Sequence, residues 1–415
     1  MGKKGKGRQL VVGLDVGTTK TCAIIAEAGP AGTLNVIGVG TRPSRGLRKG
    51  VVVNVAATVE AIKKAVEDAE REAGVEVESV YAGVAGGHIR GTNSRGAVAV
   101  TGKNKEVGQA DIERAIDAAR IVHLTQDREI IHVFPQCFVV DDQDGIKEPL
   151  GMCGARLEVD IHVVTGAVTS VQNVIQSVNR AGLAVQDIVL EPLASCEAVL
   201  FQDEKELGVI LIDVGGGTTD AALFRDNAIW HTAVLPLGGD HITNDIAVGL
   251  RTPTEEAEEL KRSYGCALTA LVQKDETIHV PSVGGRKPRE ISRQALSGII
   301  QARVEEIFTL VARKLARAGL EDAAHAGVVI TGGSSIMEGV PELAEQVFDL
   351  PVRRGTPMGV GGLADVVGSP IYATGVGLAL YGARLGGNGF LMEDSDGHLL
   401  QRISRRMREW FGELF

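Results

Sequence analysis

The sequence has little cysteine and few aromatic residues. Only 4% of its 415 residues are aromatic, and its five cysteines are scattered and form no CxxC pair. They are Cys22, Cys137, Cys153, Cys196 and Cys266. Neither a disulfide framework nor a zinc site is indicated, and a reducing cytosol is favoured. The chain also lacks the HExxH motif of zinc proteases and the GxxxxGK[ST] motif of P-loop nucleotidases.

Long hydrophobic runs are missing as well. No run reaches the ~18 apolar residues that read as a membrane-spanning helix. Residues 1–9 are basic, but the apolar run that follows them is interrupted at Asp15, so we expect a flexible tail and not a signal peptide. The net charge of −10 argues against nucleic acid as the main partner.

Glycine and aliphatic residues are abundant. The chain has 53 glycines and is 44% hydrophobic, a mixture typical of α/β proteins with many tight turns. Its length is too great for one hydrophobic core and fits two lobes or several subdomains.

The central stretch, residues 207–224, reads LGVILIDVGGGTTDAALF and places three glycines between two apolar runs. Both runs are typical of buried strands, so we expect a hairpin. Gly215, Gly216 and Gly217 would let backbone N–H groups close on phosphate oxygens, with hydroxyl donors from Thr218 and Thr219. Asp213, at the end of the strand, is placed to hold a hydrated Mg²⁺. The alternative is a glycine-rich hairpin that only turns the chain.

A second copy of this pattern favours the phosphate interpretation. Residues 10–26, LVVGLDVGTTKTCAIIA, again run from an apolar strand through an aspartate and a glycine to two threonines and a second strand. Two such hairpins, about two hundred residues apart, suggest two related halves that hold one nucleotide from opposite sides. A third glycine turn follows residues 328–331, where a base or ribose could lie against bare backbone; an ordinary strand-to-helix connection is the alternative.

Residues 86–165 differ in character from the α/β pattern around them. They contain strand-like residues 97–100, 130–140 and 157–164 and a helix over 109–122, and nothing in them looks catalytic. We therefore expect a compact α+β insertion that serves as an interaction module. Further along, residues 252–255 read as a capping box with proline at the first helical position.

The end of the chain carries an amphipathic pattern. After a polar, glycine-rich linker, residues 399–415 place apolar side chains on one helical face and arginines elsewhere. The apolar face comprises Leu400, Ile403, Met407, Trp410, Phe411 and Leu414, and the arginines are Arg402, Arg405, Arg406 and Arg408. A basic amphipathic helix on a tether indicates binding to a membrane surface, and packing on the protein's own body is the alternative.

Several motifs resemble those of the actin and sugar-kinase superfamily. Asp15-Val-Gly-Thr-Thr-Lys, Asp213-Val-Gly-Gly-Gly-Thr-Thr-Asp and Ile330-Thr-Gly-Gly-Ser-Ser look like its two phosphate motifs and its adenosine motif, and Glu191-Pro192-Leu-Ala and Tyr372-Ala-Thr-Gly-Val-Gly are similar to its connecting segments. Within that superfamily the chain resembles the FtsA family of bacterial cell-division proteins along nearly its whole length. Lys49-Gly-Val-Val-Val-Asn, the insertion and the terminal basic helix carry this closer likeness.

The resemblance implies an α/β, actin-like two-lobed ATPase fold of duplicated ribonuclease-H-like domains, with an inserted subdomain and a C-terminal amphipathic helix. It implies ATP and Mg²⁺ as cofactors and polymerisation with itself. It also implies a peripheral protein on the cytoplasmic face of the inner membrane at the division site. There it would bind anionic phospholipid, anchor the tubulin-like protein FtsZ and help recruit later division proteins.

The same resemblance implies roles for individual residues. Contacts to the β- and γ-phosphates fall to Gly17, Thr18, Thr19, Lys20, Gly215, Gly216, Gly217 and Thr218. Asp15 and Asp213 would hold Mg²⁺ through water. Glu258, Lys261 and Arg262 would contact the base, and Gly332, Gly333 and Ser334 would back the adenosine. Glu191 matches the position that orients the attacking water, and we expect ATP turnover that is at most slow or conditional.

The predicted division of the chain follows from these assignments. Lobe 1 comprises residues 10–85, 166–192 and a return helix over 369–383, and lobe 2 comprises 193–249 and 292–368 with a small subdomain over 250–291. A tail (1–9), the insertion (86–165), a linker (384–398) and the membrane helix (399–415) complete it. Two other functions stay open: a small-molecule kinase of the same superfamily, and an FtsA-like cytosolic scaffold of a pilus assembly system.

Overall fold

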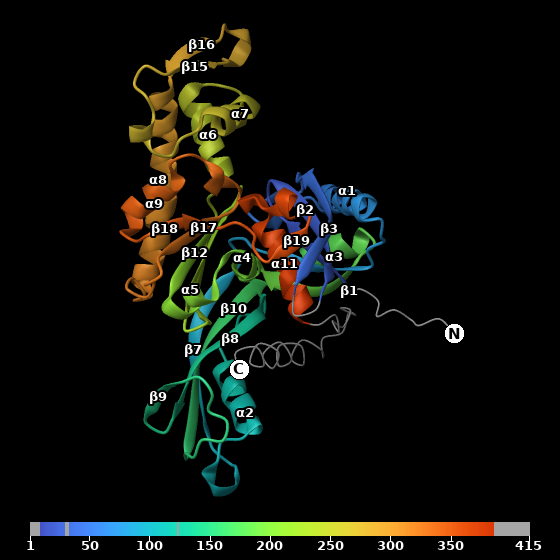
Figure 1. Ribbon diagram of the computed structural model, residues 1–415, viewed down its shortest axis with the longest axis vertical. Coiled ribbons are helices and arrows are strands. Elements are labelled where there is room, and N and C mark those ends of the chain that lie inside the picture. Colours follow the sequence, from blue (N-terminus) through green and yellow to red (C-terminus); the bar gives the residue numbers. More distant parts are fainter. Residues whose placement is uncertain (1–8, 30–32, 123, 386–415) are drawn as a thin grey trace, which may run out of the picture.

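The computed structural model describes residues 9–29, 33–122 and 124–385. Two lobes lie side by side, the inserted subdomain extends from one end of the molecule, and a small subdomain extends from the other (Figure 1). The predicted flexible tail (1–9) lies outside the described residues except for Gln9, and so does most of the linker and all of the amphipathic segment. No helix in the described ranges is both long enough and apolar enough to span a membrane.

Lobe 1 is built on a six-stranded sheet of order β11-β6-β1-β2-β3-β19. β1 (Gln9–Val16), β2 (Lys20–Ala28) and β3 (Leu34–Pro43) form an antiparallel meander, and β6 (Ser79–Val84) and β11 (Ala184–Leu190) continue the sheet in parallel. α1 (Val55–Ala73) packs closely on β3, since a side chain at Gly40 would overlap the carbonyl oxygen of Ala65. α3 (Val168–Arg180) lies beside α1.

Lobe 2 repeats this arrangement. Its sheet has the order β14-β13-β12-β17-β18. β12 (Val209–Val214), β13 (Thr219–Arg225) and β14 (Ala228–Leu235) form the meander, and β17 (Val328–Thr331) and β18 (Val352–Arg354) add the parallel strands. α6 (Gly239–Leu250), α8 (Arg293–Arg317) and α9 (Val340–Phe348) share a hydrophobic core with one face of the sheet. The predicted duplication and the two predicted hairpins are therefore confirmed.

Two helices lie between the sheets. α4 (Glu191–Val199) leaves lobe 1 for lobe 2, and α11 (Ala373–Arg384) belongs to the chain's return. The helices cross in close contact, because a side chain at Gly377 would overlap the carbonyl oxygen of Ala194. Val209 and Leu211 of β12 face the core that contains these helices, whereas Ile210 and Ile212 face the other core. Burial on both faces explains why β12 is apolar at every position up to Asp213.

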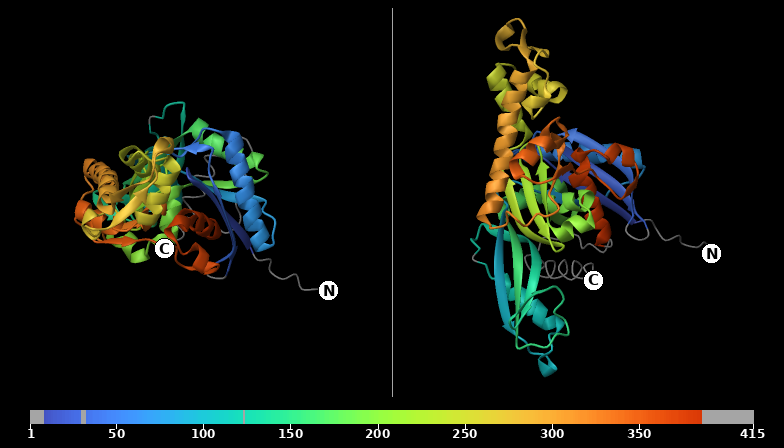
Figure 2. Two further views of the ribbon diagram at one scale, coloured as in Figure 1. Left: turned by 90° about the horizontal axis from the view of Figure 1, so that it is seen from above. Right: turned by 60° about the vertical axis from the view of Figure 1, so that its left-hand side comes forward.

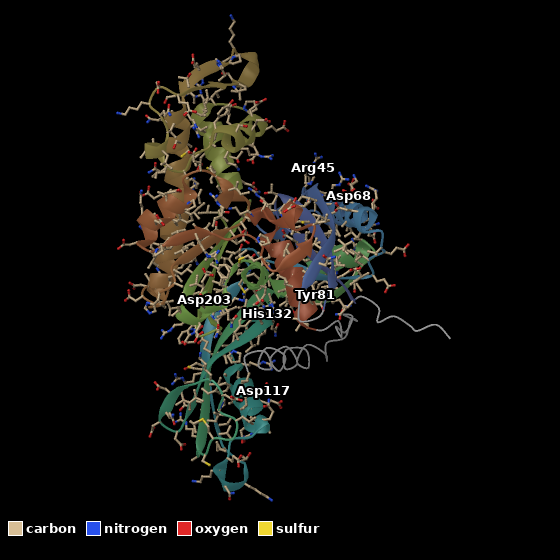
Figure 3. The ribbon with its side chains drawn as sticks, in the orientation of Figure 1. Arg45, Asp68, Tyr81, Asp117, His132 and Asp203 are labelled. Atoms are coloured by element: carbon tan, nitrogen blue, oxygen red, sulfur yellow. The ribbon has the colours of Figure 1, made fainter. Side chains whose placement is uncertain are left out.

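The insertion forms its own sheet and core. β7 (Arg90–Ala99), β8 (Arg128–Val140), β9 (Gln143–Ile146) and β10 (Arg156–Ala167) pair in the order β7-β10-β8-β9, and α2 (Gln109–Ala119) covers one face (Figure 2). The helix ends three residues earlier than predicted, and β9 was not predicted. At the junction with lobe 1, His132 Nε2 accepts a hydrogen bond from the Leu190 N–H at 3.1 Å (Figure 3).

The small subdomain of lobe 2 contains α7 (Thr254–Tyr264) and the hairpin of β15 (Thr277–Val280) and β16 (Arg289–Ser292). The predicted capping box at its start is wrong. Pro253 has ψ 148° and precedes the helix, so α7 begins at Thr254 without a side-chain cap. The Thr252 hydroxyl is instead buried, with no hydrogen-bond partner among the described residues.

Short elements complete the fold and shift two predicted boundaries. They are β4 (Leu47–Arg48), β5 (Val51–Val52), α5 (Gln202–Leu207), α10 (Ala364–Val367), β19 (Val360–Gly362) and the single turns η2 (Lys103–Lys105), η3 (Thr269–Leu271), η4 (Val283–Gly285), η5 (Gly333–Ile336) and η6 (Pro370–Tyr372). β19 pairs with β3, so the chain has returned to lobe 1 by Val360 and not at the predicted residue 369. The boundary predicted between residues 192 and 193 falls inside α4.

Candidate functional site

The turns of the two hairpins, one from each lobe, lie against each other. A side chain at Gly216 would overlap the hydroxyl of Thr19, and one at Gly217 would meet the side chain of Thr18. Thr18 Oγ1 also accepts a hydrogen bond from the Gly50 N–H at 3.0 Å. The structure thus brings together the two glycine turns that the sequence placed in a common site.

The aspartate of the first hairpin is paired with a cation. Asp15 is buried, and its Oδ2 accepts a hydrogen bond from Lys20 Nζ at 2.9 Å. Burial alone would lower the pKa of the Lys20 ammonium, but the acidic groups around it, Asp15 foremost, together outweigh burial and raise the pKa. Lys20 therefore stays charged and compensates Asp15.

The aspartate of the second hairpin is held by neutral groups. Asp213 Oδ2 accepts hydrogen bonds from Ser195 Oγ at 2.8 Å and from Thr374 Oγ1 at 3.2 Å. Burial raises the pKa of the Asp213 carboxyl, and the two hydroxyls act in the opposite direction. A side chain at Gly332 would overlap Asp213 Oδ1, so the third glycine turn also packs against this carboxylate. Sequence reasoning missed Ser195 and Thr374.

Two further carboxyl groups lie near these aspartates. Burial, and then the charges of Asp15, Asp220 and Asp213, raise the pKa of Glu191 well above its ordinary value. Burial and Asp213 raise the pKa of Asp220 to about 7, and its Oδ1 is buried with no hydrogen-bond partner in the described part of the chain. Hard carboxylate oxygens in excess over the single lysine suit Mg²⁺. Within residues 9–29, 33–122 and 124–385 no group of three or more acidic, histidine or cysteine side chains is arranged to hold a metal ion.

Several residues predicted to bind adenosine lie close together around the start of α6. Ser334 Oγ donates to the Gly215 carbonyl oxygen at 3.3 Å, and the Gly239 N–H donates to the same oxygen at 2.9 Å. Lys261 Nζ lies 2.6 Å from Glu258 Oε2 and 3.1 Å from the Gly239 carbonyl oxygen.

Thr243 of α6 bridges Glu258 and Lys261 by hydrogen bonds and was not predicted, although the glycine pair that begins α6, Gly238 and Gly239, could have indicated this turn. Arg262 is exposed on the same helix, and Gly333 opens η5 beside Gly332. Arg262 lies on α7 with Glu258, and its charge, after that of Lys261, helps to lower the pKa of the Glu258 carboxyl.

Comparison with known proteins identifies the family. The family model "Cell division protein FtsA" matches residues 210–377, and "SHS2 domain inserted in FTSA" matches residues 86–165. The cell division protein FtsA of Pseudomonas aeruginosa is 53% identical over 387 residues, covering 93% of this chain and 92% of that relative. The chain belongs to the FtsA family.

Other FtsA relatives match over almost their full length. The FtsA protein of Neisseria meningitidis is 44% identical, covering 97% of this chain and 98% of the relative, and that of Escherichia coli K12 is 38% identical, covering 99% and 98%. The SHS2 match has the same limits as the predicted insertion. This FtsA-family chain is therefore a cell-division protein, and neither the kinase nor the pilus-scaffold alternative is favoured.

Solved structures place this FtsA-family chain in the actin-like fold. A chain of the PilM–PilN type IV pilus biogenesis complex aligns with a TM-score of 0.66 at 18% identity, covering 90% of this chain and 98% of that chain. MreB5 of Spiroplasma citri bound to ADP aligns with a TM-score of 0.54 at 15% identity, covering 90% and 95%. At these identities the likeness concerns the fold alone.

Proposed function

We propose that this protein binds MgATP between its two hairpins, polymerises, and tethers FtsZ to the cytoplasmic face of the cell membrane at the division site. The observation that carries the nucleotide part is the meeting of the two duplicated Asp-Gly-Thr turns, each at the end of a buried strand. The division part rests on membership of the FtsA family.

In this proposal different residues bind the phosphates, the metal ion and the adenosine. Backbone N–H groups of both turns, with Lys20, hold the β- and γ-phosphates, because these donors carry positive charge and leave space for oxygen atoms. Asp213 and Asp15 orient water on Mg²⁺, which when bound neutralises phosphate charge. Glu258, Lys261, Arg262, Gly332, Gly333 and Ser334 hold the adenosine.

Hydrolysis is proposed to be slow or conditional. We assign the orientation of an attacking water to Glu191, whose pKa is raised by burial and by the nearby charges of Asp15, Asp220 and Asp213. A carboxyl that stays protonated accepts a proton poorly, so Glu191 would act well only when a bound cation offsets its acidic neighbours.

The attachment to lipid is proposed from the sequence of residues 399–415, which lie outside the described residues. Six apolar side chains on one face and four arginines suit an anionic membrane surface. One such helix binds reversibly, and polymerisation would raise the effective concentration of helices and make attachment firm. We further propose that the insertion contacts neighbouring subunits or later division proteins.

The test combines nucleotide and lipid binding. Calorimetry should show MgATP binding, and the protein should carry FtsZ into the pellet with anionic liposomes. Trp410→Glu should abolish the pelleting and leave MgATP binding intact. If this variant pellets as well as the parent, the terminal segment does not act as the membrane anchor; if the parent does not bind MgATP, the nucleotide assignment is wrong.

A further inference from the structure

Three buried polar side chains from three elements meet behind the second hairpin. Ser195 comes from α4, Thr374 from α11, and Asp213 is the last residue but one of β12. Ser195 is 0% exposed, and Asp213 and Thr374 are each 8% exposed. The two hydroxyl oxygens are 3.1 Å apart, and both lie within hydrogen-bond distance of the same carboxylate oxygen, Asp213 Oδ2.

This arrangement shows where the hydroxyl hydrogens of Ser195 and Thr374 must point. A carboxylate has no proton to donate, so Ser195 and Thr374 each direct their single O–H to Oδ2. Hydrogen bonds to a charged acceptor are stronger than those between neutral groups, and two of them fix the rotation of the carboxylate about its side chain. Oδ1 takes no part in this pair of bonds and faces the turn at Gly332.

The two donors sit on the helices that lie between the sheets. α4 and α11 cross so closely that Gly377 has no room for a side chain above Ala194. α11 also packs on β1 of lobe 1, where a side chain at Gly13 would overlap the Gly375 carbonyl oxygen. A rotation of lobe 2 against lobe 1 would therefore move β12 relative to α11 and to the Thr374 hydroxyl. By contrast, Asp15 is held by Lys20, which lies on the adjoining strand of the same sheet and moves with it.

We propose that Ser195 and Thr374 are positioning residues that hold Asp213 in the pose that orients the metal-bound water, and that they make this pose depend on the angle between the lobes. The inference rests on the proposed MgATP function and deepens it. The orientation of the Asp213 carboxylate then depends on how far the lobes have closed, whereas the orientation of Asp15 is fixed by a residue of its own lobe.

The test removes the hydroxyls while keeping the shape of the site. Thr374→Val and Ser195→Ala remove one donor each, and Thr374→Ser keeps the donor. Ser177→Ala is the control, because Ser177 is also fully buried but donates to the Asn173 carbonyl oxygen in α3. ATP affinity is measured by calorimetry with Mg²⁺ and with EDTA, and hydrogen–deuterium exchange of residues 213–218 is measured without nucleotide.

We expect the gain in ATP affinity from Mg²⁺ to fall about tenfold in Thr374→Val and in Ser195→Ala, because each loses a hydrogen bond to a charged group. Affinity in EDTA should change less than about twofold, and exchange of residues 213–218 should rise. Thr374→Ser and Ser177→Ala should match the parent in all three measurements. A merely structural role would lower both affinities together.

The results separate this inference from the function beneath it. If the parent gains affinity from Mg²⁺ and Thr374→Val and Ser195→Ala keep that gain in full, the positioning role is overturned. Equal losses in Thr374→Val and Thr374→Ser would overturn it as well, because the hydroxyl would not be the cause. If the parent gains no ATP affinity from Mg²⁺, the proposed nucleotide function fails, and with it the metal role of Ser195 and Thr374. Faster exchange of residues 213–218 in the variants would then show only that the two hydroxyls hold Asp213 in place.

Discussion

The sheets of the two lobes share a three-stranded meander and two parallel strands, but their equivalent aspartates are held by different groups. Asp15, next to the last residue of β1, pairs with the ammonium of Lys20, whereas Asp213, next to the last residue of β12, is held by two hydroxyls. Lys20 supplies a counter-charge that stays with Asp15, and hydroxyls supply direction without charge. The duplicated scaffold therefore offers one compensated carboxylate and one whose charge is available to a metal ion. The symmetric metal role predicted for the two aspartates becomes, in our proposal, an unequal one.

The equivalent edge strands of the two sheets, β3 and β14, are covered by different elements. β3 is covered by β19, which pairs with it in parallel. β14, the equivalent strand of lobe 2, is contacted instead by the insertion, which belongs to lobe 1 in sequence. Gln136 Nε2 donates to the carbonyl oxygens of Ile229 and Trp230, each at 3.1 Å, and His162 Nε2 lies 2.9 Å from Thr232 Oγ1. Side chains here satisfy edge carbonyls that a neighbouring strand would otherwise satisfy.

The comparison of the aspartates is tested most strongly by Asp213→Asn against Asp15→Asn. Both substitutions keep the side chain's shape and remove its charge. We expect Asp213→Asn to weaken MgATP binding by roughly 100-fold and Asp15→Asn by roughly tenfold, since only Asp213 lacks a paired cation. Calorimetry at saturating Mg²⁺ measures both. Equal losses would mean that the two carboxylates share the metal role after all.

Lys20→Met tests whether the ammonium that pairs with Asp15 also contributes to ATP binding. Removing the ammonium takes away a phosphate contact and leaves Asp15 without its counter-charge, so ATP affinity should fall about tenfold. Lys274→Met, a change at an exposed lysine of the small subdomain, should leave the affinity unchanged. A Lys20→Met protein that binds ATP like the parent would show that the ammonium serves Asp15 alone.

The contact between the hairpin turns can be broken with one methyl group. Gly216→Ala places its Cβ against the Thr19 hydroxyl, so the turns must separate. We expect a loss of about 1–3 kcal/mol in the free energy of unfolding, measured with denaturant, and weaker ATP binding. Gly298→Ala is the control, because its Cβ would meet nothing within 4 Å and lies within α8; it should be neutral or stabilising.

The smallest expected effect concerns the edge of lobe 2. Burial, and then His231, lower the pKa of His162 to about 3 from an ordinary value of 6.5. Below pH 6.5 the folded protein therefore binds fewer protons at His162 than the unfolded chain does. The free energy of unfolding that is present above pH 6.5, where His162 is neutral in both states, is partly lost as the pH falls toward 3.

His162→Gln should accordingly reduce the fall in unfolding free energy between pH 7 and pH 5 by about 1–2 kcal/mol. The same comparison with His279→Gln, at an exposed histidine of β15, should show no such reduction. An unchanged pH dependence in His162→Gln would mean that the histidine is not held neutral at this interface.

The sequence predicted what was encoded locally. Both hairpins carry glycines between short apolar strands, so these elements appear where expected. The insertion could be delimited because its pattern breaks from its surroundings at residue 86.

The features that were missed depend on distant partners. Ser195 and Thr374 are small hydroxyl residues in apolar helices, a common occurrence, and nothing near Thr374 in sequence announces an aspartate 161 residues earlier. β19 has only three residues, two of them glycine, so its pairing with β3 has no periodic signal. The start of α7 depended on the ψ of one proline, which the capping pattern does not determine.

The packing of α11 on β1 has a consequence for how the chain acquires its fold during synthesis. Gly13 of β1 lies so close to α11 that a side chain there would overlap the carbonyl oxygen of Gly375, and the ring of Tyr81 meets that of Tyr381 edge-on, 6.3 Å between centroids. β1, which precedes all other described elements along the chain, is thus covered by the last described helix. Lobe 1 must wait, with one face of its sheet partly uncovered, until α11 has been translated, whereas the insertion has a core of its own and can fold meanwhile.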